Sequence, residues 1–156
     1  MNNKYFPERQ IDANDLFYVC YMIERVARRV RHRNNYVVRK FSDDRLWHYL
    51  SLADVYHSEN PEKIEEEWIA ELKLRHGSFD ITNVRKDLNI NIPRPSQMAA
   101  VYTRLIEQTM SSTEDYVHAI RRVYAHPICR KIDDYNCSAF YEPSYEIARA
   151  YRENGF

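Results

Sequence analysis

Two adjacent arginines and a histidine near residue 120 come closest to a catalytic set in this sequence. Arg121 and Arg122 precede His126 within a stretch of six residues. A histidine can act as general base or acid on a 2′-hydroxyl, and a guanidinium can stabilise the charge of a phosphorane. Together they would supply the chemistry of a metal-free ribonuclease. The alternative is that His126 lies at a helix end and caps the carbonyls of the last turn.

The spacing of these three residues is that of a known motif. The pattern Arg121-x4-His126 resembles the R-x4–6-H signature of the helical HEPN ribonucleases, which are toxins or accessory nucleases built on all-α bundles of this size. The resemblance implies catalysis by Arg121, Arg122 and His126. Those families usually place Asn, Asp or His after the arginine, and Arg122 departs from that pattern. Arg25 and His32 form a second match of the same kind.

A second candidate site is a cluster of cations in the first third of the chain. Between Glu24 and Arg45 lie eight basic residues: Arg25, Arg28, Arg29, Arg31, Arg33, Arg39, Lys40 and Arg45. On a helix, spacings of three and four residues place Arg25, Arg28 and Arg29 on one face, where guanidinium groups can bind phosphates or carboxylates.

An acidic segment follows this basic one. Its carboxylates are Asp54, Glu59, Glu62, Glu65, Glu66, Glu67 and Glu71. The first interpretation is that the two faces pack side by side and form ion pairs within the molecule. The alternatives are nucleic-acid binding through residues 25–45 and docking of a partner protein on Arg25, Arg28 and Arg29.

Aromatic residues crowd the carboxy-terminal segment. The last 22 residues contain Tyr135, Phe140, Tyr141, Tyr145, Tyr151 and Phe156. Tyrosine joins a large apolar ring to a polar tip and is therefore enriched at protein interfaces. We expect Tyr135, Tyr141, Tyr145 and Tyr151 to contribute to a partner-binding surface. The alternative is that the segment folds back over the core and buries these rings.

Imidazole and thiol groups near residue 130 raise the question of a metal site. His126, Cys129 and Cys137 could supply zinc ligands, but a structural zinc site needs four ligands in paired short spacings, and this set has one such pair. Packing as small hydrophobic side chains is the better interpretation for the cysteines. We therefore expect no metal and no other cofactor.

Hydrophobic periodicity predicts most of the elements that position these residues. The predicted helices begin near residues 14, 42, 61, 96, 111 and 143, the fifth with Ser111 and Glu114 as a capping box, and Gly77 and Gly155 close the third and the last. Residues 36–40 are predicted to form a short extended link. Residues 78–95 are predicted to form a connector and a candidate subdomain joint.

The composition places these elements in one all-α domain. Two glycines against thirteen tyrosines leave little material for hairpins or phosphate-binding loops. We predict a compact bundle of five to six helices over residues 1–156, with little or no β-sheet. Lys plus Arg and Asp plus Glu both number 23, and the longest apolar run has eight residues, far short of the roughly 20 of a membrane span. A soluble, cytoplasmic protein without a membrane partner is expected.

A wider resemblance covers residues 17–72. The positions that carry it are Tyr21 to Glu24, Tyr49-Leu50, Val55 to Ser58 and the acidic helix at 64–72. They are similar to a small bacterial helical domain family of unknown function, often encoded beside ADP-ribosyltransferase-like toxins. The resemblance implies an accessory or neutralising role. Since no catalytic set is complete, the sequence favours a non-enzymatic interaction module that binds another protein or itself; the ribonuclease and nucleic-acid binder are the alternatives.

Overall fold

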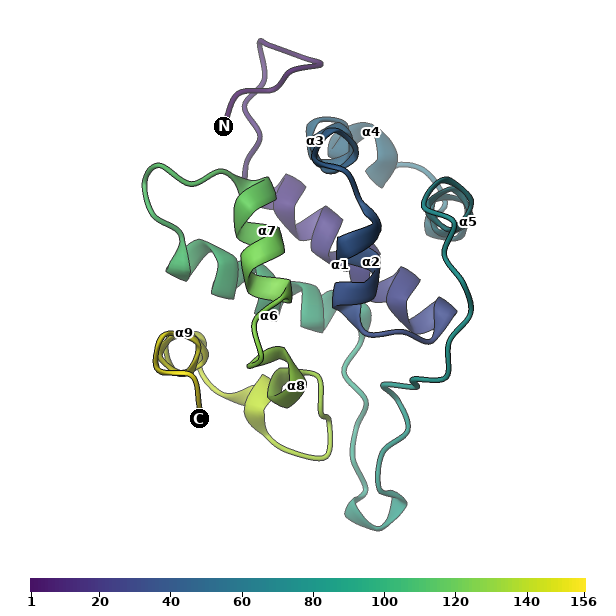
Figure 1. Cartoon of the computed structure of the whole chain (residues 1–156), viewed down its shortest axis with the longest axis vertical. Coiled ribbons are helices and arrows are strands. Elements are labelled where there is room, and N and C mark those ends of the chain that lie inside the picture. The colour runs from purple at the N-terminus through teal and green to yellow at the C-terminus, as the bar shows by residue number, and fades with distance from the viewer.

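The computed structural model describes residues 1–156 and shows a bundle of helices joined by turns and loops (Figure 1). The elements are α1 (Ala13–Val30), α2 (Asn34–Lys40), α3 (Asp43–Ser51), α4 (Ala53–His57), α5 (Pro61–Glu71), η1 (Lys86–Leu88), α6 (Pro95–Thr109), α7 (Tyr116–Tyr124), α8 (Cys129–Ile132), η2 (Ala139–Tyr141) and α9 (Ser144–Glu153), where η marks a 3-10 helix. The predicted all-α fold class is confirmed, since no strand forms and the β-type pairing is one bridge between Asn2 and Gln10. No helix combines the length and apolar character needed to cross a lipid bilayer.

Helix α1 lies at the centre of the molecule, with α2, α3, α4, α5 and α6 packed against it (Figure 1). Its start is fixed by a capping box, in which the Asp12 carboxylate accepts the amide of Asp15 and the Asp15 carboxylate accepts the amide of Asp12. The apolar side chains that recur at steps of three and four residues along this helix are all buried, namely Leu16, Val19, Cys20, Ile23, Val26, Ala27 and Val30. At the end, Arg31 adopts the left-handed conformation with φ 58°.

The prediction of an extended link at residues 36–40 is wrong, because these residues belong to α2. The β-branched Val37 and Val38 have low helix propensity, but both are buried, and α2 packs between α1 and α7. Burial of both side chains therefore outweighs local propensity. Helices as short as α2, α4 and α8 are also the reason that the bundle has nine α-helices rather than five to six.

The predicted capping box at Ser111 and Glu114 is also wrong. Helix α7 begins after Asp115, whose carboxylate accepts the amide of His118 at 2.9 Å. The Glu114 carboxylate instead points toward Arg122, eight residues further along the chain, and accepts two hydrogen bonds from its guanidinium. Hydrogen bonds between a carboxylate and a guanidinium are stronger than uncharged ones, so Glu114 pairs with Arg122. Asp115 caps the helix instead.

The buried apolar side chains form one continuous core to which both halves of the chain contribute. Its largest fully buried members are Trp68, Tyr49 and Tyr102. Residues 72–94 connect α5 to α6 and contain only the short η1, around which the chain extends away from the helices (Figure 1). The predicted connector at 78–95 thus falls between the two helices, except that Pro95 is the first residue of α6.

Gly77 holds this connector against the end of α1. Its amide donates to the carbonyl of Val30 at 2.7 Å, and the amide of Phe79 donates to the carbonyl of Arg31 at 3.0 Å. A Cβ atom at Gly77 would lie 2.5 Å from the Arg31 carbonyl oxygen and 2.6 Å from the His32 ring. The requirement for glycine is therefore a close backbone approach; the left-handed positions at Lys73 and Asn154, near the ends of α5 and α9, are occupied by other residues.

We expect Gly77→Ala to lower the free energy of unfolding by about 1–3 kcal/mol, because the backbone oxygen of Arg31 can move only with the end of α1. Gly155→Ala is the matched control, since a Cβ there meets no atom within 4 Å. Urea unfolding followed by tryptophan fluorescence measures both. Equal midpoints for the two variants would contradict the close approach.

Candidate functional site

Two tyrosines near the carboxy terminus project into solvent. The side chain of Tyr141, at the end of η2, is 66% exposed, and that of Tyr145, in the first turn of α9, is 72% exposed. Between them Glu142 and Pro143 are extended, with ψ of 150° and 147°, and these two residues link η2 to α9. The neighbouring Phe140 is buried. One ring of this segment is therefore buried in the core, and two project from the surface.

An apolar groove of about 380 Å³ runs between α6 and the η2–α9 segment. Helix α9 packs against α6 at the edge of the bundle (Figure 1). The apolar side chains in the groove are Met98, Val101, Leu105, Phe140, Tyr141 and Ile147. The exposed ring of Tyr141 is therefore continuous with an apolar surface deep enough to hold a side chain of another molecule.

A second hollow, of about 620 Å³, lies between α8 and the carboxy terminus. Its lining includes Arg130 and Lys131 from α8 and the half-exposed ring of Phe156. The side chains of Arg104, Arg130 and Lys131 form no ion pair and no hydrogen bond. Glu142 lines both hollows, so cations outnumber carboxylates only toward α8, where Arg130 and Lys131 make the surface complementary to acidic groups.

We call Arg104, Arg130, Lys131, Tyr141, Tyr145 and Phe156 the C-terminal face. Of the four tyrosines expected at a partner-binding surface, Tyr141 and Tyr145 belong to it. Tyr135 does not, because its ring is buried and its hydroxyl donates to Glu24 of α1 at 3.0 Å. The expectation that Tyr135 is available to a partner is therefore corrected. The reason is the buried hydrogen bond to Glu24, a residue 111 positions away in sequence.

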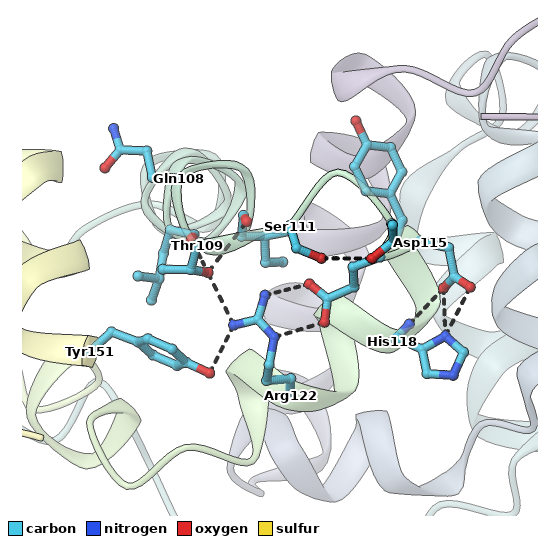
Figure 2. A network of polar contacts seen from close by, with 12 residues as sticks. Gln108, Thr109, Ser111, Asp115, His118, Arg122 and Tyr151 are labelled. Carbon is cyan, nitrogen blue, oxygen red and sulfur yellow. Dashed lines mark hydrogen bonds and ion pairs between the residues drawn. The ribbon is translucent and has the colours of Figure 1, made fainter. Parts of the chain in front are cut away.

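Tyr151 is half-buried and forms part of a polar network (Figure 2). Its hydroxyl accepts a hydrogen bond from Arg122 at 2.8 Å, and the same guanidinium donates to Thr109 at 3.1 Å. Arg122 also binds Glu114 with two hydrogen bonds of 2.7 and 2.9 Å. This network ties α9 to α6 and α7, which gives Tyr151 a structural role.

The structure brings Arg122 and His126 together, since both contact Tyr151. The His126 ring lies 4.1 Å from the Tyr151 ring, centroid to centroid, and its Nδ1 accepts the amide of Ile128 at 3.0 Å. Arg121 points elsewhere, toward the carbonyl of Phe41 at 2.7 Å and the carboxylate of Asp43 at 2.8 Å. The hydrogen bonds of both arginines are thus directed to protein groups, and this geometry favours structural roles over phosphate binding.

Internal partners also engage the three arginines singled out on α1. Arg25 pairs with Glu65 of α5 at 2.6 Å, and Arg29 pairs with Glu65 and Glu66 at 3.5 and 3.4 Å. Arg28 pairs with Glu24 at 3.4 Å. Ion pairs also hold Arg31 and Arg45, so five of the eight basic residues between 25 and 45 have a carboxylate partner. Arg25, Arg29 and Arg45 pair with the acidic segment, as the first interpretation states, whereas Arg28 pairs within α1 and Arg31 pairs with Asp80 of the connector.

A buried polar cluster that the sequence analysis missed joins α1, α6 and the segment after α8. The Tyr102 hydroxyl donates to Asp133 at 2.7 Å, and Tyr135 donates to Glu24, which also pairs with Arg28. Burial raises the pKa of Asp133 well above its usual range, and the nearby Glu24 carboxylate raises it further. One feature of the sequence could have indicated this cluster. On α1, Glu24 lies one turn after the buried Cys20 and one turn before the buried Ala27, and a buried carboxylate there needs a partner.

The cysteines occupy ordinary packing positions. The Cys129 thiol donates to the Val123 carbonyl at 3.1 Å, and the Cys137 thiol contacts the carbonyls of Lys131 and Asp134. Burial raises the pKa of the Cys20 thiol to about 11, which disfavours the reactive thiolate. No group of three or more His, Cys, Asp or Glu side chains has an arrangement that could hold a metal ion.

The two candidate sites thus differ in whether their polar side chains are free to bind another molecule. Exposed aromatic rings lie beside three unpaired cations on the C-terminal face, whereas the arginines and the histidine of the candidate catalytic set bind neighbouring groups of the protein. No protein-family model matches this chain, and neither a curated protein nor a solved structure matches it significantly.

Proposed function

We propose that this chain is a non-enzymatic protein–protein interaction module that binds an acidic partner protein through the C-terminal face. The observation that carries the proposal is the exposure of Tyr141 and Tyr145 beside an apolar groove. Exposed tyrosines next to a side-chain-sized groove are the features that provide most of the binding energy at protein interfaces. The unpaired Arg104, Arg130 and Lys131 select for carboxylates on the partner.

The biological setting we propose is that of a bacterial accessory or antitoxin-like protein. Its support is the resemblance of residues 17–72 to helical domains encoded beside ADP-ribosyltransferase-like toxins. An interaction module whose binding energy comes from exposed rings could cover the working surface of such a neighbour without any chemistry of its own. Co-expression tests this setting: a neighbouring gene that is toxic alone should be tolerated with this chain.

Nucleic acid is the competing occupant, because the same three unpaired cations could bind phosphates. The two occupants differ in salt dependence. A phosphate-bound complex loses affinity steeply with added salt, by about tenfold or more between 50 and 200 mM when several phosphates are contacted. A complex held mainly by aromatic rings in an apolar groove loses much less.

Affinity purification from the native host tests the proposal. In mild salt, the wild-type chain should carry one stoichiometric partner, a protein with an acidic surface. Each exposed tyrosine at the centre of such an interface contributes about 2 kcal/mol or more, so Tyr141→Ser with Tyr145→Ser should abolish co-purification. Tyr5→Ser, at an exposed tyrosine outside the C-terminal face, is the control and should retain the partner. A monomeric wild-type chain with no stoichiometric partner would contradict the proposal.

A further inference from the structure

A small polar hollow of about 220 Å³ lies where the connector between α5 and α6 meets the segment that follows α8. Its lining comes from Arg33, at the start of α2, from residues 79–83 of the connector and from residues 130–136. We call it the connector hollow. Sites for drug-sized ligands have volumes of roughly 300–1,000 Å³, so this smaller space suits a small ion or a single side chain.

One buried side chain presents an unused oxygen to the connector hollow. Asp133 lines the hollow and is only 5% exposed, and its Oδ1 accepts the Tyr102 hydroxyl at 2.7 Å. Its Oδ2 forms no hydrogen bond within the chain. Unlike the Oε2 atom of Glu24, which is fully enclosed, Asp133 Oδ2 keeps accessible surface. Buried polar atoms nearly always have a partner, so Oδ2 leaves one hydrogen-bond position open at the hollow.

Two guanidinium groups without partners also line the connector hollow. The guanidinium of Arg33 lies 4.2 Å from the centre of the Phe79 ring, which is itself part of the lining. Arg130 of α8 is the second. Neither side chain forms an ion pair or a hydrogen bond. Guanidinium groups bind carboxylates and phosphates through paired N–H donors, so both arginines are available to an anion.

Two exposed or half-buried carboxylates share this lining, and both have partners. Asp80 pairs with Arg31, which lies outside the lining, at 3.3 Å. Asp134 accepts the backbone amide and the side-chain amide of Asn136 at 3.0 and 3.2 Å. The charge of Asp80 is thus neutralised, whereas Asp134 has hydrogen bonds but no cation. Among these groups, the two free guanidinium groups exceed the uncompensated carboxylates by one charge.

Asp133 does not change this balance while it holds a proton. Burial raises the pKa of its carboxyl well above the usual range, and the nearby Glu24 raises it further. Since the Tyr102 hydroxyl donates to Oδ1, the proton is left to Oδ2, which can donate it into the hollow. One carboxylate complements a net charge of this size together with such a donor.

We propose that the connector hollow binds a carboxylate, held between the guanidinium groups of Arg33 and Arg130 and accepting a hydrogen bond from Asp133. The carboxylate belongs either to a small free acid or to an aspartate or glutamate side chain of a bound protein. Arg130 is shared with the C-terminal face, but Arg33 and Asp133 are not. The site therefore goes beyond the surface that carries the proposed function and does not rest on it.

Titration of the ¹⁵N-labelled chain, without a partner protein and at constant ionic strength, tests the site. Propionate represents a small free acid, and acetyl-Gly-Glu-Gly-amide represents a glutamate side chain. We expect saturable one-to-one binding of at least one probe, with a dissociation constant on the order of 1 mM for a ligand of this size. Amide shifts should centre on residues 79–83 and 130–136. Ethylammonium, of opposite charge, should not bind.

The two carboxylate probes separate the two sources. Saturation by propionate alone assigns the hollow to a small acid, and saturation by the peptide alone assigns it to a side chain of a protein. Saturation by both shows that the carboxylate group itself is recognised. Because the titration contains no partner protein, its result is independent of co-purification through Tyr141 and Tyr145.

Four variants locate the binding. Arg33→Gln and Arg130→Gln should each weaken it about tenfold, the equivalent of one charge-assisted hydrogen bond, and so should Asp133→Leu, which keeps the size of the side chain but has no donor. Lys131→Gln is the matched control, because Lys131 is the next cation of α8, is also unpaired and lies outside this lining. Its affinity should equal that of the wild type.

The arginine variants change side chains outside the core, so they keep the test decisive even if Asp133→Leu does not fold. The site is overturned if neither carboxylate saturates, if ethylammonium binds in their place, or if the shifts lie elsewhere. It is also overturned if Arg33→Gln and Arg130→Gln bind as tightly as Lys131→Gln does.

Discussion

Replacing Arg28 with alanine is expected to lower the free energy of unfolding by about 3–5 kcal/mol, the loss typical of a broken buried ion pair. The Arg28 side chain is only 17% exposed, and its guanidinium pairs with Glu24 and donates to the Pro93 carbonyl at 2.8 Å and the Tyr135 hydroxyl at 2.9 Å. Without Arg28, the buried carboxylate of Glu24 keeps one donor, the Tyr135 hydroxyl, and no positive charge.

The matched control stands one residue away on the same helix. Arg29 also forms ion pairs, but its side chain is 40% exposed and one of its partners, Glu66, is exposed as well. Arg29→Ala should therefore cost less than about 1 kcal/mol. Urea unfolding measures both variants. If Arg28→Ala and Arg29→Ala unfold at the same urea concentration, the buried pair contributes nothing beyond an ordinary surface contact.

The second large effect is a gain of stability at neutral pH from Asp133→Asn. Because the pKa of Asp133 is raised in the folded chain by burial and by Glu24, folded Asp133 keeps its proton when the unfolded carboxyl has already released one. Stability from this group is complete below the unfolded pKa, near 3.8, and is lost as the pH rises toward the folded pKa. Asparagine never ionises, and its side-chain oxygen can still accept the Tyr102 hydroxyl.

We expect Asp133→Asn to be more stable than the wild type at pH 7 by about 1–3 kcal/mol, the usual cost of an unfavourably buried polar group. The difference should shrink as the pH falls toward the unfolded pKa, near 3.8, below which the carboxyl is neutral in both the folded and the unfolded chain. Urea unfolding between pH 4 and pH 7 measures it. A difference that stays constant across this range, or a variant less stable at pH 7, would show that Asp133 is charged in the folded chain.

This buried cluster also bears on the proposed function. Tyr135 bonds to Glu24 and Arg28 of α1, and its ring lies 5.2 Å from the ring of Phe140. Phe140 in turn lies 4.3 Å from the ring of Tyr141. The polar contacts of α1 thus hold the segment that presents the exposed tyrosines. For this reason Arg28→Ala should weaken partner binding as well as stability.

The sequence predicts the helices that carry a regular apolar stripe. The stripe of α1 and the Asn60-Pro61 start of α5 are local signals, and the structure confirms both helices. Helix α2 lacks such a signal, since its capping residue Arg33 makes no side-chain bond and its valines favour strands. What stabilises α2 is the burial of Val37 and Val38 between α1 and α7, which depends on residues far away in sequence.

The candidate site, too, could be predicted from the sequence only in part. The enrichment in tyrosine identifies Tyr141 and Tyr145, which project, but the same enrichment also includes Tyr135, which is buried. No pattern near residue 135 shows that Glu24 lies within hydrogen-bond distance of its hydroxyl. Likewise, the pairing of Arg122 with Glu114 depends on the turn that brings residue 114 to the face of α7. Residue type can indicate an interface, whereas the partner of each polar group is set by tertiary contacts.

The central claim is that the C-terminal face binds a partner, and hydrogen exchange of the chain, isolated with its co-purified partner and again alone, tests it most directly. In the complex, slower exchange should be confined to residues 97–105 and 128–156, which contain the groove, the hollow and the exposed rings. Protection found only elsewhere, for example on the acidic helix α5, would contradict the claim.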